Sequence, residues 1–333
     1  MSKRTDISVL ELGPVKEGQT TGDAMKDIVG NAKCVEELGY KRIWVAEHHN
    51  MPTISTSATV LVIGHIAQHT SSIKVGSGGI MLPNHTPLAI AEQFGTLDVL
   101  YPGRIELGLG RAPGTDQLTA AALRRGDMDR VYQFKDDIEE LQRYFSVNNA
   151  NSRVRAIPGE GQDVPMWILG SSTDSAFLAA DMGLPYAFAS HFAPQQLLSA
   201  VDIYRKNFKP SPYLDKPHVM VAANVFVADS TEEAQFLRTS FTQLVYGILS
   251  QQRIKMPPPV KQLPDILLHP DTQAALRSMS YYTFMGDKAK VSAELDIFLN
   301  ETGADELIVT NYIYDREARH RSFRLLAEVM GLV

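Results

Sequence analysis

The stretch SIKVGSGGIMLPNHTPLAIAEQFGTLDVLYPGRIELGLGR, residues 72–111, contains the strand–helix–strand unit that decides the fold. We predict a buried strand over residues 72–78, a helix within 86–103 that ends at a Pro-Gly turn, and a second strand over 104–111. Strands joined by a helical crossover run parallel in one sheet. The glycine-rich and polar residues that follow each strand would therefore gather at one end of that sheet.

The same alternation continues on both sides of this unit. Further strands are predicted at residues 6–12, 40–47, 164–172, 184–190, 217–229 and 305–315, with helical segments between them. Eight such repeats in 333 residues predict an α/β fold, a (β/α)8 TIM barrel formed by residues 1–333 as one domain. Excess chain at 240–285, with three consecutive prolines, is predicted to be an insertion after strand seven. It is either a structural excursion or a mobile lid.

Composition excludes several classes of protein. The formal net charge is −6, and no block of basic residues occurs, which disfavours a nucleic-acid partner. The single cysteine, Cys34, cannot form an internal disulfide, so a reducing compartment fits best. The sequence contains neither a signal-peptide pattern nor an apolar run long enough for a membrane span. We therefore expect a cytoplasmic protein without membrane or nucleic-acid partners.

The second predicted strand ends in Glu47, His48 and His49. The two histidines could be a satisfied hydrogen-bonding pair at the barrel mouth, a general base, or metal ligands. Adjacent side chains on a strand point in different directions, so they seldom bind one metal together. His191 and Glu106 follow or lie in other strands, but no spaced cluster of ligands accompanies them. Metal catalysis is disfavoured, and no metal site is predicted.

Three other strand ends favour a phosphate-bearing ligand. The glycines of GSGGI, residues 76–80, form either an ordinary turn or a surface that a flat ligand can approach. Arg111 follows the fourth strand and is either a phosphate clamp or a partner in a surface ion pair. Gly170, Ser171 and Ser172 lead from a strand into a helix, where they cap the helix or hold an anion. Together these residues favour flavin mononucleotide (FMN), with its phosphate at Arg111 and the serines and its ring over the glycines.

The sequence resembles the bacterial-luciferase-like flavin monooxygenases along essentially its whole length. The resemblance rests on GYKRIWVAEHH, on the block VGSGGIMLPNHTPLAIAEQFGTLDVLYPGRIELGLGRAPG, and on VPMWILGSSTDSAFLAADMGLP. It is strongest to the subgroup near the alkanal monooxygenases.

The resemblance implies roles for particular residues. His48 corresponds to the family's catalytic histidine, and Gly78 and Gly79 to a non-prolyl cis peptide beside the flavin. Arg111 corresponds to the phosphate-binding arginine and Ser172, with Ser171 adjacent, to the phosphate-binding serine. Gly110 stands where the light-emitting subunit has a cysteine, which argues against luminescence. Around this site we expect His49, His191 and Phe192 to form the substrate pocket.

The resemblance also implies an activity. Reduced FMN, delivered by a separate flavin reductase, would react with O2 and oxygenate a small organic substrate, for example an aldehyde. A homodimer through segments 58–70 and 90–100 is expected, and the family's mobile loop would fall within 240–285. Two alternatives stay open: hydride transfer with coenzyme F420, which members of the same superfamily use, and FMN binding without turnover.

Overall fold

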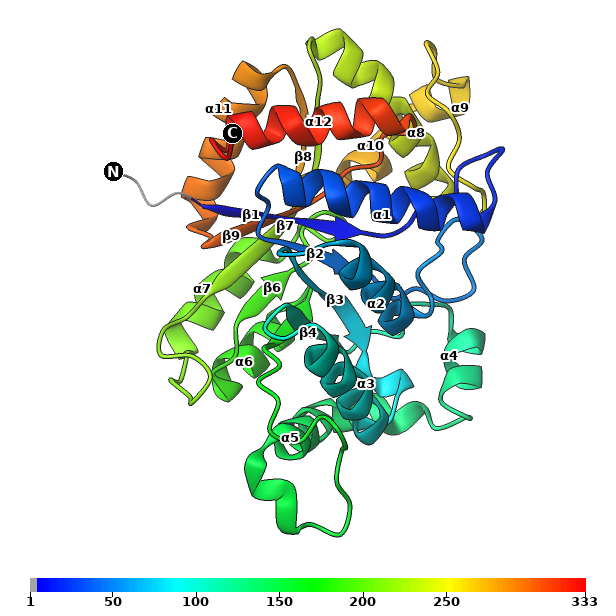
Figure 1. The fold of residues 1–333 in the computed structure, drawn as a ribbon. Helices are drawn as coiled ribbons and strands as arrows, with labels where there is room; N and C mark the ends of the chain where they lie inside the picture. Colours follow the sequence, from blue (N-terminus) through cyan, green and yellow to red (C-terminus); the bar gives the residue numbers. More distant parts are fainter. Residues whose placement is uncertain (1–4) are drawn as a thin grey trace.

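The computed structural model describes residues 5–333 as a closed barrel of parallel strands surrounded by helices (Figure 1). Eight strands close in the order β1-β2-β3-β4-β5-β6-β7-β9, and β9 returns to β1. These strands are β1 (Asp6–Glu11), β2 (Arg42–Val45), β3 (Lys74–Met81), β4 (Ile105–Gly110), β5 (Met166–Gly170), β6 (Tyr186–Phe188), β7 (Val219–Val227) and β9 (Glu306–Thr310). The predicted (β/α)8 barrel is confirmed.

The helices lie outside the barrel and connect its strands. They are α1 (Thr21–Glu37), α2 (Thr59–His69), α3 (Pro87–Leu100), α4 (Gln117–Leu123), α5 (Phe134–Phe145), α6 (Thr173–Met182), α7 (Leu197–Asn207), α8 (Thr231–Leu249), α9 (Asp265–Leu268), α10 (Pro270–Met279), α11 (Lys288–Thr302) and α12 (Arg316–Val329). Three short 3-10 helices complete the connections: η1 (Leu82–Asn84), η2 (Met128–Gln133) and η3 (Val147–Asn151). Gly39, just after α1, and Gly103, after α3, have φ of +77° and +71°, and Gly103 forms the predicted Pro-Gly turn.

A ninth strand, β8 (Thr283–Gly286), lies outside the closed ring, and the sequence did not predict it. The first part of β7 pairs with β6, from Val219 to Val221, whereas its last part pairs with β8, from Asn224 to Val227. The extra strand is consistent with an insertion after strand seven. However, α8 already begins at Thr231, so the first residues of the predicted 240–285 insertion belong to that helix.

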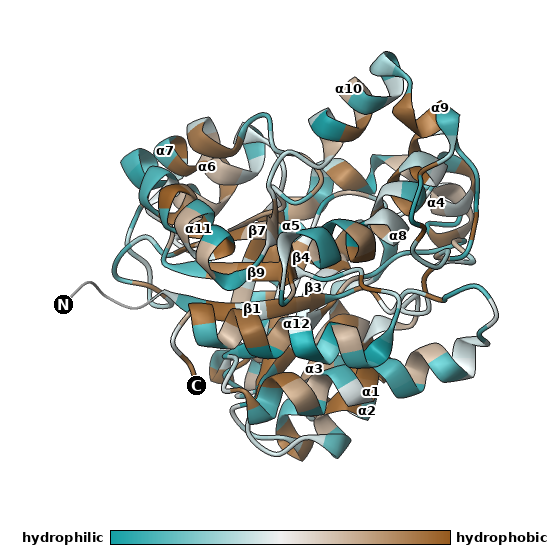
Figure 2. Cartoon of the chain, turned by 90° about the horizontal axis from the view of Figure 1, so that it is seen from above, coloured by the Kyte–Doolittle hydropathy of each residue, from teal (hydrophilic) through white to brown (hydrophobic). Residues whose placement is uncertain are grey.

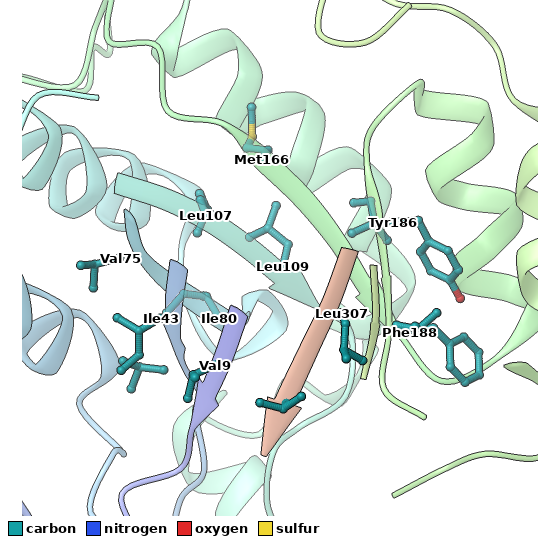
Figure 3. Packing of buried hydrophobic residues seen from close by; sticks show 14 of the residues in the cluster. Val9, Ile43, Val75, Ile80, Leu107, Leu109, Met166, Tyr186, Phe188 and Leu307 are labelled. Carbon is teal, nitrogen blue, oxygen red and sulfur yellow. The ribbon is translucent and has the colours of Figure 1, made fainter. Parts of the chain in front are cut away.

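Alternation along the strands divides the apolar residues into two layers. Val9, Ile43, Leu107 and Leu307 face the helices and belong to the main core (Figure 3). Leu10, Trp44, Trp167, Met220 and Ile308 belong to a second cluster, and their alternate positions place them inside the barrel. Figure 2 shows brown, hydrophobic colour on the central strands and mixed colour on the helices around them.

Charged side chains close the barrel at the end where the strands begin. The guanidinium of Arg42 donates to Glu106 at 2.9 Å and to Glu306 at 3.0 Å, and all three side chains are buried. The indole nitrogen of Trp44 donates to the same Glu106 oxygen at 2.9 Å. Because Arg42 pairs with both carboxylates, this end is structural, although Arg42 Nε and one Glu306 oxygen are buried without a partner, and a ligand is expected at the opposite end.

The segment after α8 is attached at that opposite end. Arg253 donates to the backbone oxygen of Asn50 at 3.0 Å and to the carboxylate of Asp116 at 2.9 Å. The amide of Met256 donates to the carbonyl of Val15 at 3.0 Å. The segment is therefore bonded to the connections that follow β1, β2 and β4.

Candidate active site

Glycines leave the inner surface of β3 and β4 without side chains. A Cβ atom added at Gly76, Gly78 or Gly108 would come within 3.0 Å of Trp44, Leu10 or Leu169, all of which pack in the interior cluster. At Gly110 it would meet only the end of the Met81 side chain, at 3.0 Å. These four inward positions are here called the glycine shelf. At Gly76, Gly78 and Gly108 neighbouring groups already fill the space beside the backbone, whereas Gly110 faces a flexible side chain that can move.

The peptide bond between Gly78 and Gly79 is cis, as the family resemblance predicted. The same place shows an irregularity in strand pairing, because the register between β3 and β4 shifts between Ser77 and Ile80. The Ser77 hydroxyl donates to the carbonyl of Gly108 at 2.8 Å and joins the two strands across the irregularity.

His48 lies just beyond β2 in a defined protonation state. Its Nδ1 is 3.2 Å from the carbonyl oxygen of Gly114. A carbonyl can only accept, so Nδ1 carries the proton in the neutral ring and Nε2 is left as an acceptor. Burial lowers the pKa of His48 below its ordinary value. Near neutral pH the ring is therefore uncharged and able to take up a proton.

His191, beyond β6, has a buried ring nitrogen that lacks a partner. Among residues 5–333, no group forms a hydrogen bond with its Nδ1. Burial, together with repulsion between the two rings when His48 is also protonated, lowers the pKa of His191 to about 3. The backbone here is held by Asn224, which donates to the His191 carbonyl at 2.7 Å and accepts from the Thr310 hydroxyl at 2.6 Å. The arrangement leaves Nδ1 available to a ligand.

The buried carboxylate of Glu47 holds a cluster that the sequence did not reveal. Its oxygens lie 2.8 Å from His49 Nε2 and 3.0 Å from His85 Nε2, and they accept from the amide of Met81 at 3.1 Å. Burial raises the pKa of Glu47, but these hydrogen bonds outweigh it and bring the value to about 2. His49, expected in the substrate pocket, is thus bound to Glu47. His85 follows a strand end in NHTP, a polar signal that could have been noticed.

Two more arginines in the β4–α5 connection were also missed. Arg124 is 6% exposed, and its Nε donates to the Asn84 side chain at 3.0 Å, whereas one of its Nη atoms is buried without a partner. Arg130 faces Asp137 at 3.3 Å, but its Nε is also buried and unpaired. Burial, and the charge of Arg130, lower the pKa of Arg124. With Arg111 and Arg125, this connection carries four arginines.

The beginning of α6 is open to an anion. Ser172 is the residue that precedes the helix, and its hydroxyl does not cap it. One backbone N–H, that of Thr173, donates to the Gln196 side chain at 3.0 Å. Arg111 lies 3.5 Å from Asp174 in the first turn of the helix, and both side chains are more than half exposed. The structure thus brings Arg111 and the serines together, with one acid beside them.

The remaining predicted residues lie around this region. Gly170 packs closely, since a Cβ atom there would overlap the side chain of Ser175. Ser171 has no hydrogen bond within the described part of the chain. Phe192 is 47% exposed, and its ring contacts His191 edge-on, with centroids 4.9 Å apart. No group of three or more His, Cys, Asp or Glu residues within 5–333 is arranged to hold a metal ion.

Comparison with known proteins identifies the family. The profile described as luciferase-like monooxygenase matches residues 5–265. The chain is also 47% identical to a luciferase-like monooxygenase of Escherichia coli (strain K12) over 98% of this chain and 97% of that protein. The chain belongs to the luciferase-like monooxygenase family. This family member is 35% identical to an N-acetyl-S-alkylcysteine monooxygenase of Bacillus subtilis (strain 168), over 69% of this chain and 70% of that protein.

Solved structures agree with the fold of this family member. The crystal structure of apo-MsnO8 superposes with a TM-score of 0.90 at 34% identity and covers 99% of both chains. At lower identity the fold alone recurs with two different cofactors. A diketocamphane monooxygenase in complex with FMN has a TM-score of 0.69 at 14% identity, and an F420-dependent secondary alcohol dehydrogenase has 0.67 at 16%.

Within residues 5–333, every helix is too short or too polar to cross a membrane.

Proposed function

We propose that this family member is a monooxygenase that uses reduced FMN and O2 to oxygenate a small organic substrate. The observation that carries the proposal is the glycine shelf on β3 and β4, which lies between His48 on one side and Arg111 with the uncapped start of α6 on the other. The shelf ends at Gly110, where the flexible end of Met81 stands beside the backbone, so a ring would approach the backbone there. The cations and helix N-terminus suit a phosphate.

The residues present fit FMN in two respects. The ring would lie over Gly78, Gly79 and Gly110, and the phosphate would bind Arg111 and the Gly170–Ser172 turn. The unpaired N–H groups of Arg124 and Arg130 add donors in the same connection. When bound, reduced flavin supplies the two electrons with which one oxygen atom of O2 enters the substrate and the other leaves as water.

His48 would act as the proton acceptor. With its Nδ1 proton held by Gly114, the free Nε2 can take a proton and later return it. Glu47 would position His48 from the adjacent position, because His49, His85 and Met81 hold its carboxylate fixed. The mostly apolar mouth, with Leu10, Leu12 and Leu169, would limit access of water to the reacting atoms.

We infer two protein partners. A flavin reductase would supply reduced FMN, since the sequence has no Gly-rich dinucleotide fingerprint after a strand. A second copy would cover α2 and α3, which lie side by side and expose Leu61 (76%), Val99 (47%) and Leu100 (61%). Apolar exposure of this kind favours an interface between copies.

A titration followed by one turnover tests the proposal. The protein is titrated with reduced FMN, oxidised FMN and reduced F420. The tightest complex is then mixed with 18O-labelled O2 in the presence of a panel of alkanals and alkyl thioethers. Reduced FMN binding with one 18O atom in the product supports the monooxygenase. Tight F420 binding with no labelled product would instead support the hydride-transfer alternative, and tight oxidised FMN without turnover a binding protein.

A further inference from the structure

Arg238 in α8 has no counter-ion within the described chain. Every other arginine of residues 5–333 is either exposed or forms a hydrogen bond or ion pair through its guanidinium. Arg238 is not exposed and forms neither. Its Nε is fully buried without a partner. Burial lowers the pKa of Arg238, and no acid acts in the opposite direction.

Arg238 is only partly buried, and the fully buried arginines Arg42 and Arg319 differ from it in having acidic partners. Arg42 is held by Glu106 and Glu306, and Arg319 by Glu11 at 3.0 Å. A guanidinium stays charged at any physiological pH, and removing part of it from water without a partner is unfavourable. A cation left unpaired in this way is a candidate for a ligand contact rather than for a role in stability.

Arg238 lies on α8 close to residues that pack beside the end of β9. Phe241, one helical turn further on, stacks on Tyr312 with ring centroids 5.1 Å apart. Tyr312 follows β9 and packs against both the interior cluster of the barrel and the cluster under α8. On the same helix face, Leu237 and Val245 are buried. Arg238 therefore neighbours, along α8, apolar residues that pack on the β7–β9 side of the barrel.

We propose that Arg238 binds the carboxylate of an organic substrate whose apolar part lies in the barrel mouth. This proposal rests on the proposed oxygenase function and adds the class of substrate, an organic anion. The planar guanidinium suits a carboxylate, which it can hold through two parallel hydrogen bonds. The apolar neighbours favour an anion with a hydrocarbon part over an inorganic one.

The phosphate of FMN is a poor alternative occupant. The phosphate-binding candidates, Arg111 and Ser172, follow β4 and β5. Arg238 follows β7, and Phe241 on the same helix stacks on Tyr312, which follows β9. In the closed ring, β6 stands between β5 and β7. A carboxylate at Arg238 and a phosphate at Arg111 would therefore occupy different sides of the same mouth.

The test uses hexanoate and its uncharged counterpart, hexanamide, with isothermal titration on the full chain both without flavin and with FMN. Hexanoate should bind more tightly than hexanamide, and Arg238→Gln should weaken hexanoate by about tenfold or more. Hexanamide should bind Arg238→Gln as it binds the wild type. The matched control is Arg277→Gln, which removes one exposed charge from the neighbouring α10 and should leave hexanoate affinity unchanged.

Further measurements decide the outcome. Thermal unfolding of Arg238→Gln should occur at or above the wild-type midpoint, because no partner is lost; a clearly lower midpoint would assign Arg238 a structural role and overturn the proposal. Equal binding of hexanoate by both proteins, equal competition by inorganic phosphate, or a selective loss of FMN over riboflavin would overturn it too. A failure of oxygenation with hexanoate binding intact would count against the proposed function alone.

Discussion

The Nδ1 atom of His48 lies 3.2 Å from the carbonyl oxygen of Gly114, and this one contact defines what His48 can do. It places the ring proton on Nδ1 and leaves Nε2 as the free acceptor. The pKa of His48, lowered by burial, keeps that acceptor available near neutral pH.

We therefore expect His48→Ala to lower the yield of oxygenated product by about a hundredfold or more, the usual contribution of a positioned acid or base. FMN affinity should change only a few-fold, because the shelf and the phosphate site stay intact. Single-turnover product analysis and a flavin titration measure the two quantities separately. An equal loss of both would mean that His48 is structural.

Arg111→Ala should weaken FMN by about ten- to a hundredfold while leaving riboflavin almost unchanged. The physical reason is that only FMN carries the phosphate that the arginine would hold beside the start of α6. Asp174→Asn is a useful counterpart, since removing the acid 3.5 Å from Arg111 should tighten FMN rather than weaken it. Fluorescence quenching with both flavins checks the result, and parallel weakening of the two would remove Arg111 from the phosphate site.

Glu47→Gln should destabilise the protein by roughly 3 kcal/mol near neutral pH. The native pKa of Glu47 is about 2, below the 4.5 of an ordinary glutamate, so its contribution is fully present above about pH 5 and is lost as the pH falls toward 2. The difference in free energy of unfolding between wild type and variant should shrink over that range. Urea unfolding at several pH values measures it, and a difference independent of pH would contradict the assignment.

The two shelf glycines of β4 should respond differently to alanine. At Gly108 the added methyl group would overlap the backbone oxygen of Ser77, which cannot move without breaking the β3–β4 pairing, so we expect a loss of about 2–3 kcal/mol or failure to fold. At Gly110 it would meet only the flexible end of Met81, at 3.0 Å, so Gly110→Ala should fold normally. Thermal unfolding of the pair checks this, and similar midpoints would argue against the close approach.

Much of the site could be anticipated because strand ends in a barrel converge. His48, Arg111 and Ser172 each follow a different predicted strand, and parallel strands bring their ends to one face. The partners of these residues could not be anticipated. His85 is 38 positions from Glu47 in sequence. The contact between them depends on how β2 and β3 pair, and that pairing cannot be derived from a single sequence.

The predicted insertion at 240–285 also shows how far a single sequence can predict structure. Residues 283–286 were predicted to lie in excess chain, yet they form β8 because the last part of β7 extends beyond β6 and offers an unpaired edge. A four-residue strand has too little periodicity of its own to be recognised.

By itself, the sequence determined the barrel, since alternating strand and helix patterns with glycines at helix ends leave few other ways to bury the apolar residues. It also placed the polar residues that end each strand. The tertiary structure alone decided which of them are already bonded, as His49 is to Glu47, and which are free, as His191 and Arg238 are. The physical reason is that a polar side chain bonds to the groups that lie near it in space. Residues far apart in the sequence become such neighbours only when the strands have closed into a ring.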